Sequence, residues 1–313
     1  MKKIGLIFPG QGSQYVGMGQ DLYEHFPVAR QTFAEAQEAL GFDLAAVCFS
    51  GPEEKLKLTA ITQPAVLTVS VAMWRVIQSE EKVKPVGAAG HSLGEYGALV
   101  AAEALPFAQA VRLVHWRGKF MQEAVPVGEG AMAAIMNMSA AEVETLCAEA
   151  AQGEVLTPAN YNSPGQIVIA GHRKAVERAV AMVAQKSGKK AIILPVSAPF
   201  HCPLMRPAGE RLQEVLAQIN FSDPTFPVLA NAEADFYPGK EAIRELLVKQ
   251  VDHPVRWEEC MQKLLQIGVD MVWEVGPGKV LTGLLRRINR EVPVANIEDK
   301  SSWEKAKAWL KIN

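Results

Sequence analysis

One stretch, residues 86–95, restricts most strongly what this chain can fold into. It opens with Val86-Gly87-Ala88-Ala89, small and apolar residues that are typical of a strand buried on both faces. The chain then passes through Gly90-His91-Ser92-Leu93-Gly94, which fits the pattern G-x-S-x-G, and continues into a helix-forming run at residues 98–102. Strand, sharp turn and helix are the context in which this pattern forms a nucleophile elbow, with Ser92 at its apex. A chance match in a glycine-rich loop is the alternative, because short patterns recur by accident.

The composition is that of a globular protein and excludes several functional classes. With 313 residues, of which 49% are hydrophobic, the chain can form one large domain or one domain that carries an insertion. The net charge of -2 gives no indication of a nucleic-acid surface. We expect no membrane association, because the N-terminal apolar run is too short for a signal peptide and no apolar stretch approaches the ~18 residues of a transmembrane helix. The four cysteines form no C-x-x-C pair, which argues against zinc or disulfides and for a reducing compartment, the cytoplasm.

The predicted elements indicate an α/β fold with two domains. Residues 1–127 and 198–313 are expected to form a large, hydrolase-like catalytic domain whose parallel sheet leads into the elbow. Residues 128–197 run β-α-β-β-α-β, which predicts a ferredoxin-like small domain inserted in the large one and facing the elbow. Strands are expected at residues 4–8, 86–90, 131–138, 155–160, 166–170, 191–196, 228–230 and 271–275. Helices are expected at residues 29–40, 65–77, 98–102, 107–124, 140–151, 174–186, 203–219, 243–251, 257–265, 281–288 and 303–312.

The loop after the first predicted strand, residues 9–14, is rich in backbone N–H donors. A dinucleotide-binding pattern laid on its glycines would require a further glycine where Tyr15 stands, so no nucleotide site is expected. An elbow needs backbone donors for the oxyanion that forms during acyl transfer. We expect one from the N–H of Leu93, the residue after the serine, and the second from Gln11 in this loop.

A serine hydroxyl needs a base, and His201 is the best placed of six histidines. It lies between a predicted strand and a predicted helix, where α/β sheets place their active-site groups. His91 adjoins the serine, but neighbouring side chains at a sharp turn point apart, so it is a poor base. No aspartate lies between Ser92 and His201, where elbow hydrolases carry their triad acid. Either a carboxylate from elsewhere, such as Asp252, holds the histidine, or a neutral acceptor holds it in a dyad.

Arg117 is a cation on the apolar side of a predicted helix. It shares a stripe with Ala110, Val114 and Met121, at spacings of four, three and four residues. A buried charge needs a partner. The partner is either an internal glutamate or the carboxylate of a ligand, which a guanidinium binds in a planar, two-point fit, and the residues alone leave both open.

Six motifs, in this order, resemble one known family. They are Phe8-Pro9-Gly10-Gln11-Gly12-Ser13-Gln14, Thr62-Gln63-Pro64-Ala65, Gly90-His91-Ser92-Leu93-Gly94-Glu95, Arg117-Gly118, Pro199-Phe200-His201 and Glu274-Val275-Gly276-Pro277-Gly278. Over essentially the whole chain they are similar to the malonyl-CoA–acyl carrier protein transacylases of type II fatty-acid synthesis.

The resemblance implies a ping-pong transfer of malonyl from malonyl-CoA to the phosphopantetheine thiol of acyl carrier protein, by a monomer that uses no metal or redox cofactor. Ser92 would carry the acyl group, His201 would be its base, and Gln250 would orient that histidine through its main-chain carbonyl. Arg117 would bind the malonyl carboxylate, and the two oxyanion donors would keep that role. The residues assigned to substrate binding besides Arg117 are Gln63, His91, Met121, Asn160 and Asn162.

Three other functions stay open. The first is a polyketide-pathway acyltransferase that uses malonyl or a related extender, although Phe200 before the histidine resembles the malonyl type. The second is a serine hydrolase, which the internal Arg117 and the missing aspartate count against. The third is a non-catalytic binding protein, which the intact serine and histidine make a poor fit. For a carrier protein, Lys189-Lys190 and Arg286-Arg287-Arg290 are either a basic docking rim or a solvated face.

Overall fold

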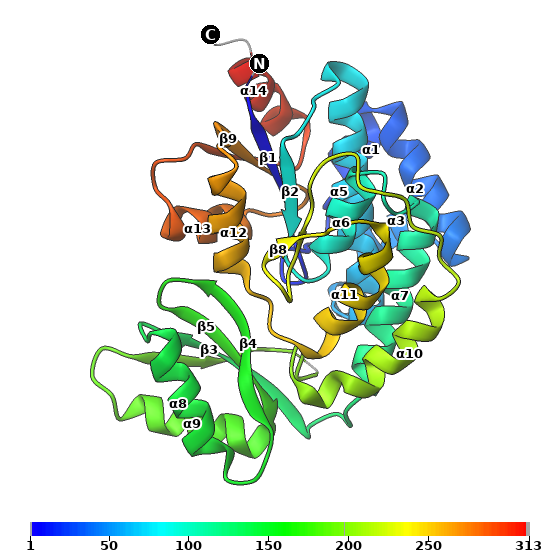
Figure 1. Ribbon diagram of the computed structural model, residues 1–313. Coiled ribbons are helices and arrows are strands. Elements are labelled where there is room, and N and C mark those ends of the chain that lie inside the picture. Colours follow the sequence, from blue (N-terminus) through cyan, green and yellow to red (C-terminus); the bar gives the residue numbers. More distant parts are fainter. Residues whose placement is uncertain (1, 197, 311–313) are drawn as a thin grey trace.

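A four-stranded parallel sheet lies at the centre of the larger part of the molecule (Figure 1). The computed structural model describes residues 2–196 and 198–310. The strands of this sheet are β1 (Ile4–Phe8), β2 (Gly87–Gly90), β9 (Met271–Val275) and β10 (Val294–Ile297). Their order is β10-β9-β1-β2, and every neighbouring pair runs parallel. The predicted α/β class with a parallel sheet is therefore confirmed.

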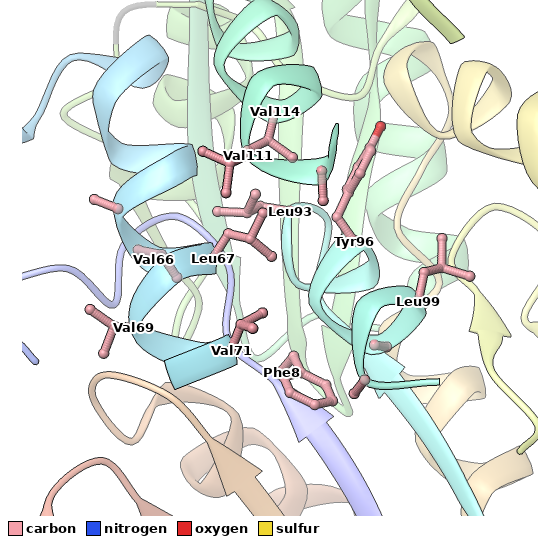
Figure 2. Packing of buried hydrophobic residues seen from close by; sticks show 14 of the residues in the cluster. Phe8, Val66, Leu67, Val69, Val71, Leu93, Tyr96, Leu99, Val111 and Val114 are labelled. Carbon is pink, nitrogen blue, oxygen red and sulfur yellow. The ribbon is translucent and has the colours of Figure 1, made fainter. Parts of the chain in front are cut away.

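Helices cover both faces of this sheet, as the apolar residues of β1 require. Leu6 and Phe8 lie in one apolar cluster, and Ile7, which points the other way, lies in another. The first cluster, part of which Figure 2 shows, is built by α5 (Thr59–Glu81), α6 (Gly94–Ala101) and α7 (Phe107–Glu123). The second is covered by α12 (Trp257–Gln266) and α13 (Val280–Ile288). A buried sheet with helices on both faces is the usual setting of parallel strands.

Shorter elements complete this part of the molecule. The remaining helices are α1 (Gln20–His25), α2 (Pro27–Leu40), α3 (Leu44–Ser50), α4 (Glu53–Leu56), the 3-10 turn η1 (Pro203–Met205), α10 (Arg206–Leu216), α11 (Lys240–Asp252) and α14 (Lys300–Leu310). A two-stranded antiparallel pair joins β7 (Leu229–Ala230) to β8 (Asp235–Phe236). Val228, just before β7, makes a parallel bridge with Ala88 of β2.

A second, antiparallel sheet is drawn in green below the first part in Figure 1. Its strands are β3 (Gly130–Met136), β4 (Leu156–Ser163), β5 (Gln166–His172) and β6 (Lys190–Ile193), in the order β4-β5-β3-β6. Two helices, α8 (Ala140–Ala151) and α9 (Arg173–Ala184), bury one face of it together with Ala133 and Ile135. Met132 and Ala134, on the opposite face, belong to the apolar cluster of the larger part. This face of the small sheet therefore packs against the larger part of the molecule.

A backbone pairing also joins the small sheet to the larger part. Asn160 of β4 makes a parallel bridge with Val255, which lies just before α12. The N–H of Tyr161 donates to the carbonyl of Val255 at 2.9 Å, and the N–H of Val255 donates to that of Ala159 at 2.9 Å. This pairing places β4 against the larger part and leaves β6 at the other edge of the small sheet.

Most of the predicted elements are present, with ends that differ by a few residues. The helix predicted at 203–219 is η1 followed by α10, because Pro203 and Pro207 each favour the first turn of a new helix. The elements without a predicted counterpart are α1, α3, α4, β8 and β10, each two to seven residues long. The predicted domain boundary at residue 197 and the predicted end of the last helix at residue 312 lie outside the described residues.

The expectation that no segment is long and apolar enough to span a membrane is wrong for α5. Its 23 residues contain an 18-residue window with a mean hydropathy of 1.3. In the structure 83% of that window is buried, between α2, α7 and the sheet. A helix that is apolar all round is what a core position requires, so protein packing accounts for this composition.

Two glycines of the structure differ sharply in the space around them, and this difference predicts opposite effects of alanine. A Cβ on Gly94 would lie 2.0 Å from the carbonyl oxygen of Phe8, which is backbone and cannot rotate away. We expect Gly94→Ala to lower the free energy of unfolding by about 3 kcal/mol or more. For Gly283, inside α13, no described atom beyond its chain neighbours and its own helix backbone lies within 4 Å of such a Cβ. Gly283→Ala should leave stability unchanged or raise it by up to about 1 kcal/mol. Urea unfolding measures both, and a Gly94→Ala protein as stable as the native chain would contradict this packing.

Candidate active site

Ser92 stands at a sharp turn between β2 and α6. Its φ is 52°, in the left-handed region that a residue with a Cβ occupies at a cost of roughly 1–2 kcal/mol. The turn closes tightly, because a Cβ on Gly90 would lie 1.9 Å from the backbone of Gly94. The N–H of Ser92 donates to Asn231 Oδ1 at 2.7 Å, and Asn231 Nδ2 donates to the carbonyl of Gly90 at 2.8 Å. The side chain of Asn231 therefore holds both sides of the turn by hydrogen bonds.

The loop after β1 lies against this turn. A Cβ on Gly10 would come within 2.4 Å of the carbonyl oxygen of His91, so only glycine allows this approach. As a result Gln11 and Leu93 line the same cavity as Ser92. Among residues 2–196 and 198–310, no acceptor pairs with the backbone N–H of Gln11 or of Leu93. Two free donors beside the serine are what an oxyanion requires.

The structure brings His201 and Ser92 together. The Nε2 of His201 lies 2.7 Å from Ser92 Oγ, and its Nδ1 lies 2.8 Å from the main-chain carbonyl of Gln250. A carbonyl can only accept, so Nδ1 carries the proton and Nε2 accepts the serine hydroxyl. Asp252, the carboxylate considered as an alternative, instead accepts from His253 Nδ1 at 2.6 Å. The neutral-acceptor dyad is thus the arrangement observed.

The surroundings of His201 keep it neutral. Its ring is buried, and its backbone φ of 59° lies in the left-handed region, like that of Ser92. Burial, and next the positive charge of Arg117, lower the pKa of His201 to about 3. At neutral pH the imidazole is therefore unprotonated and ready to accept the serine proton.

Arg117 lies buried beside the serine. Its Nη1 donates to Gln63 Oε1 at 2.8 Å, and its Nη2 donates to Gln250 Oε1 at 2.9 Å and to Ser92 Oγ at 3.1 Å. None of the ion pairs within the described part of the chain includes Arg117, and its Nε–H has no acceptor there. The guanidinium carbon lies over the ring of Tyr96, 5.5 Å from its centroid. The internal salt bridge considered from the sequence is therefore not formed.

Pro64 and Gly118 bring Gln63 and Arg117 together. Pro64 lies inside α5 and has no N–H, so the carbonyl of Ala60 loses its helical donor. His115 of α7 donates to that carbonyl instead, at 2.7 Å from its Nδ1. A Cβ on Gly118 would lie 2.5 Å from the carbonyl oxygen of Thr59, so α7 approaches α5 closely at this point. The two motifs read from the sequence thus form one helix contact.

A cavity of about 120 Å³ opens onto these groups. At about 30 Å³ for each water molecule, it accommodates a small acyl group. Of the predicted binding residues, Gln63, His91, Arg117, Met121 and Asn160 line it. Asn162 does not line it but holds His91, whose Nε2 lies 2.8 Å from Asn162 Oδ1. Burial lowers the pKa of His91.

Some residues around the site were not predicted from the sequence. The unpredicted lining residues are Met132, Leu194, Val196 and Phe200, from β3 and from the segment that leads to His201. Asn231 was also missed, although its place directly after a strand of the larger part is a recognisable signal. Gln250 lies beneath the cavity, where its main chain and its side chain both contact the reactive groups.

Comparisons with known proteins agree with one another. A family described as acyl transferase domain matches residues 6–305. The malonyl CoA-acyl carrier protein transacylase of Escherichia coli (strain K12) is 50% identical over 302 residues, 96% of this chain and 98% of that protein. The enzyme of the same name from Bacillus subtilis (strain 168) is 46% identical and covers 99% of this chain and 98% of its own length.

Solved structures are similar throughout. The malonyl CoA-acyl carrier protein transacylase from Coxiella burnetii has a TM-score of 0.95 at 45% identity, covering 97% of this chain and 96% of that one. A malonyl-transacylase solved in complex with its type II PKS acyl-carrier protein has a TM-score of 0.94 at 48% identity, covering 97% and 98%.

The low pKa of His201 predicts how serine reactivity depends on pH. A histidine with the ordinary pKa of 6.5 is about 97% protonated at pH 5 and cannot act as a base. We expect phenylmethylsulfonyl fluoride to label Ser92 at a nearly constant rate from pH 7 down to pH 5. Removing the cation in Arg117→Ala raises the pKa of His201, so the rate should fall at a higher pH than in the native protein. Arg117→Lys, which keeps the charge, serves as the control. If the labelling rate of the native and Arg117→Ala proteins falls at the same pH, Arg117 does not act on the pKa of His201.

Proposed function

The chain belongs to the acyl transferase domain family, together with the malonyl-CoA–acyl carrier protein transacylases, and from this premise we propose that it transfers malonyl from malonyl-CoA to the thiol of an acyl carrier protein. The observation that carries this function is a buried Arg117 without an ionic partner in the described residues, 3.1 Å from a serine that is paired with a neutral histidine. A nucleophile beside a free buried cation suits an acyl group that ends in a carboxylate.

The geometry supports a two-step transfer through Ser92. In the first step Ser92 Oγ attacks the thioester carbonyl of malonyl-CoA, and its proton moves to His201 Nε2 at 2.7 Å. The C–S bond then breaks, and the thiolate leaves as coenzyme A with that proton. In the second step the carrier thiol gives its proton to His201, attacks the malonyl-serine ester and releases the serine hydroxyl.

Neutral groups stabilise the charges that arise along this path. The imidazolium is oriented by the Gln250 carbonyl, 2.8 Å from its Nδ1. The oxyanion of each tetrahedral intermediate is placed between the free N–H groups of Gln11 and Leu93, which line the cavity. These steps need no metal or redox cofactor, and we expect none to take part.

Arg117 and the cavity together select the acyl group. An acyl group without a terminal carboxylate leaves the buried guanidinium without an anion, which is unfavourable. The cavity of about 120 Å³ limits the length of the acyl chain. Malonyl satisfies both conditions.

The fold details that the sequence suggested are part of the same proposal. The left-handed Ser92 between β2 and α6 supports a hydrolase-like nucleophile elbow. The strand order β4-β5-β3-β6, with α8 and α9 on one face, supports a ferredoxin-like small domain over residues 128–197, inserted between segments 1–127 and 198–313. We further propose a cytoplasmic monomer.

The carrier protein could belong to one of two pathways. A malonyl-transacylase with 48% identity to this chain was solved with a type II PKS acyl-carrier protein, so polyketide synthesis is a second candidate beside fatty-acid synthesis. A plain hydrolase is less well supported, because hydrolysis gives no role to the unpaired cation Arg117.

A small basic surface near the cavity suits an acidic carrier protein. Gln166 pairs with Met136 across β5 and β3, and Met136 pairs with Lys190 across β3 and β6, so all three side chains project from one face of the small sheet. Gln166 and Lys190 lie about 10 Å apart, because one strand separates them. Arg287 Nη1 donates to Gln166 Oε1 at 2.6 Å, which places Arg287 beside that face. Met132, on the same face, lines the cavity.

The other basic residues named from the sequence lie apart from this surface. Arg286 and Arg290 line a separate groove beside Trp309. Lys189 is paired with Glu142 at 3.4 Å. The proposed docking surface is therefore reduced to Lys190 and Arg287.

The function is tested by the mass of the intact protein after mixing with malonyl-CoA or acetyl-CoA. We expect a malonyl adduct on the native protein, little acetyl adduct, and no adduct on Ser92→Ala. Arg117→Ala should lose malonyl labelling by about 10²-fold or more and gain acetyl labelling, because the unpaired buried cation is gone. Absence of any adduct, or equal labelling of the native protein by both thioesters, would contradict the proposal.

The docking surface predicts a difference between two neighbouring arginines, Arg287 near the end of α13 and Arg290 just after it. Arg287→Glu should raise the KM for acyl carrier protein about fivefold at low salt and leave malonyl-serine formation unchanged, because rim charges act on encounter with the partner. Arg290→Glu makes the same change of charge just after the end of α13, in the groove beside Trp309, and should leave this KM unchanged. Equal KM values for the two variants would argue against the surface.

A further inference from the structure

Glu95 is a buried carboxyl that acyl transfer itself does not use. It stands in the first turn of α6, fully buried, and it does not line the cavity. Three groups donate to it. The N–H of Asn231 and Nε2 of Gln250 donate to Oε2, at 2.9 and 2.7 Å, and the hydroxyl of Tyr237 donates to Oε1. A buried acceptor with this many donors determines how they are oriented.

Oε2 of Glu95 is one of the two acceptors that set which way the Gln250 amide faces. An amide has a donating end and an accepting end. Both hydrogens of Gln250 Nε2 are used, one by Glu95 and one by the carbonyl of Ser92 at 2.9 Å. Gln250 Oε1 is thereby turned toward Arg117, whose Nη2 donates to it at 2.9 Å. A reversed amide would set its NH₂ against the guanidinium and its oxygen against the carboxyl.

Arg117 depends on this orientation for its own position. Amide oxygens hold it from two sides, Gln63 Oε1 at Nη1 and Gln250 Oε1 at Nη2. These acceptors are neutral, so they fix the plane of the guanidinium and leave its charge available to a ligand. Without Gln250 Oε1, one side of that support is lost.

We propose that Glu95 is a positioning residue for acyl selection, whose Oε2 orients the Gln250 amide so that Gln250 holds Arg117 in the plane a malonyl carboxylate requires. This inference rests on the proposed function, because it assigns Arg117 to the malonyl carboxylate. It adds a residue that contacts neither the substrate cavity nor the reacting atoms.

The role needs an acceptor at Oε2 and not a charge. Burial raises the pKa of Glu95 to about 7, so near neutral pH many molecules carry a proton there. The Tyr237 hydroxyl faces Oε1 and can accept as readily as donate. The proton therefore has a place on Oε1, and Oε2 stays an acceptor in both protonation states.

Two substitutions separate the effect of the acceptor at Oε2 from the effects of the charge and the length of the side chain. In Glu95→Gln the amide oxygen can take the place of Oε2, with the NH₂ toward Tyr237. We expect the ratio of malonyl to acetyl labelling of Ser92 to stay within about threefold of the native value. Glu95→Met has a similar length and no acceptor, so the ratio should fall about tenfold or more through slower malonyl labelling. A merely structural role would slow both thioesters together.

Matched variants control for the loss of stability. Tyr237→Phe removes a hydrogen bond to the same carboxyl but leaves Oε2 in place, so it should keep the native ratio. Urea unfolding reports whether each variant is folded. If Glu95→Met does not fold, Gln250→Met is tested in its place. It removes the side-chain amide that links Glu95 to Arg117 but keeps the main-chain carbonyl, and the labelling ratio should fall there too.

The outcomes distinguish this inference from the function on which it rests. If the folded variant, Glu95→Met or Gln250→Met, keeps the native ratio of malonyl to acetyl labelling, Glu95 does not have this role. The same follows from a ratio in Glu95→Gln as low as in Glu95→Met, because the charge would then be what matters. A native protein that does not prefer malonyl, or an Arg117→Ala protein that still does, instead contradicts the proposed function.

Discussion

The site depends on one costly feature, a cation buried without an ionic partner in the described residues. Arg117 lies within α7 on its apolar face, and only neutral oxygens accept from it. Burying a charge is unfavourable unless hydrogen bonds or an anion compensate. The close contact of α5 and α7 at Gly118 brings Gln63 into reach, and the end of α11 brings Gln250. The packing of three helices thus serves to keep one positive charge oriented and unneutralised.

A second constraint is conformational, and the same network bears on it. Ser92 and His201 both have left-handed backbones, which persist only where the surroundings determine them. Around Ser92 the surroundings are the clamp of Asn231, the tight turn at Gly90 and the backbone of Phe8 against Gly94. Parallel strands β1 and β2 end side by side, so these contacts follow from their register. The sheet therefore positions Ser92, and the loops pack around it.

The residues to which we assign the chemistry could be picked out from the sequence, because their signals are local. Ser92 is marked by its turn pattern, and Arg117 by a helical stripe. The residues that support them could not be predicted in the same way. Asn231 and Tyr237 hydrogen-bond to the Ser92–Glu95 turn across 139 and 142 positions, and no spacing in the chain records that proximity. In the same way, β10 is four residues long, and only its pairing with β9 makes it a strand.

The neutral partner of His201 and the charge of Arg117 depend on each other, because both side chains contact the same serine oxygen. Arg117 Nη2 and His201 Nε2 lie 3.1 and 2.7 Å from the same serine oxygen. A carboxylate placed against the imidazole would lie close to the guanidinium, and the two would form a buried ion pair. That pair would occupy the cation that the substrate carboxylate needs. A main-chain carbonyl orients the imidazole without this competition, and Glu95, the nearby carboxyl, is separated from Arg117 by the Gln250 amide. In the function we propose, the absence of a triad acid thus leaves Arg117 available to an acidic acyl group.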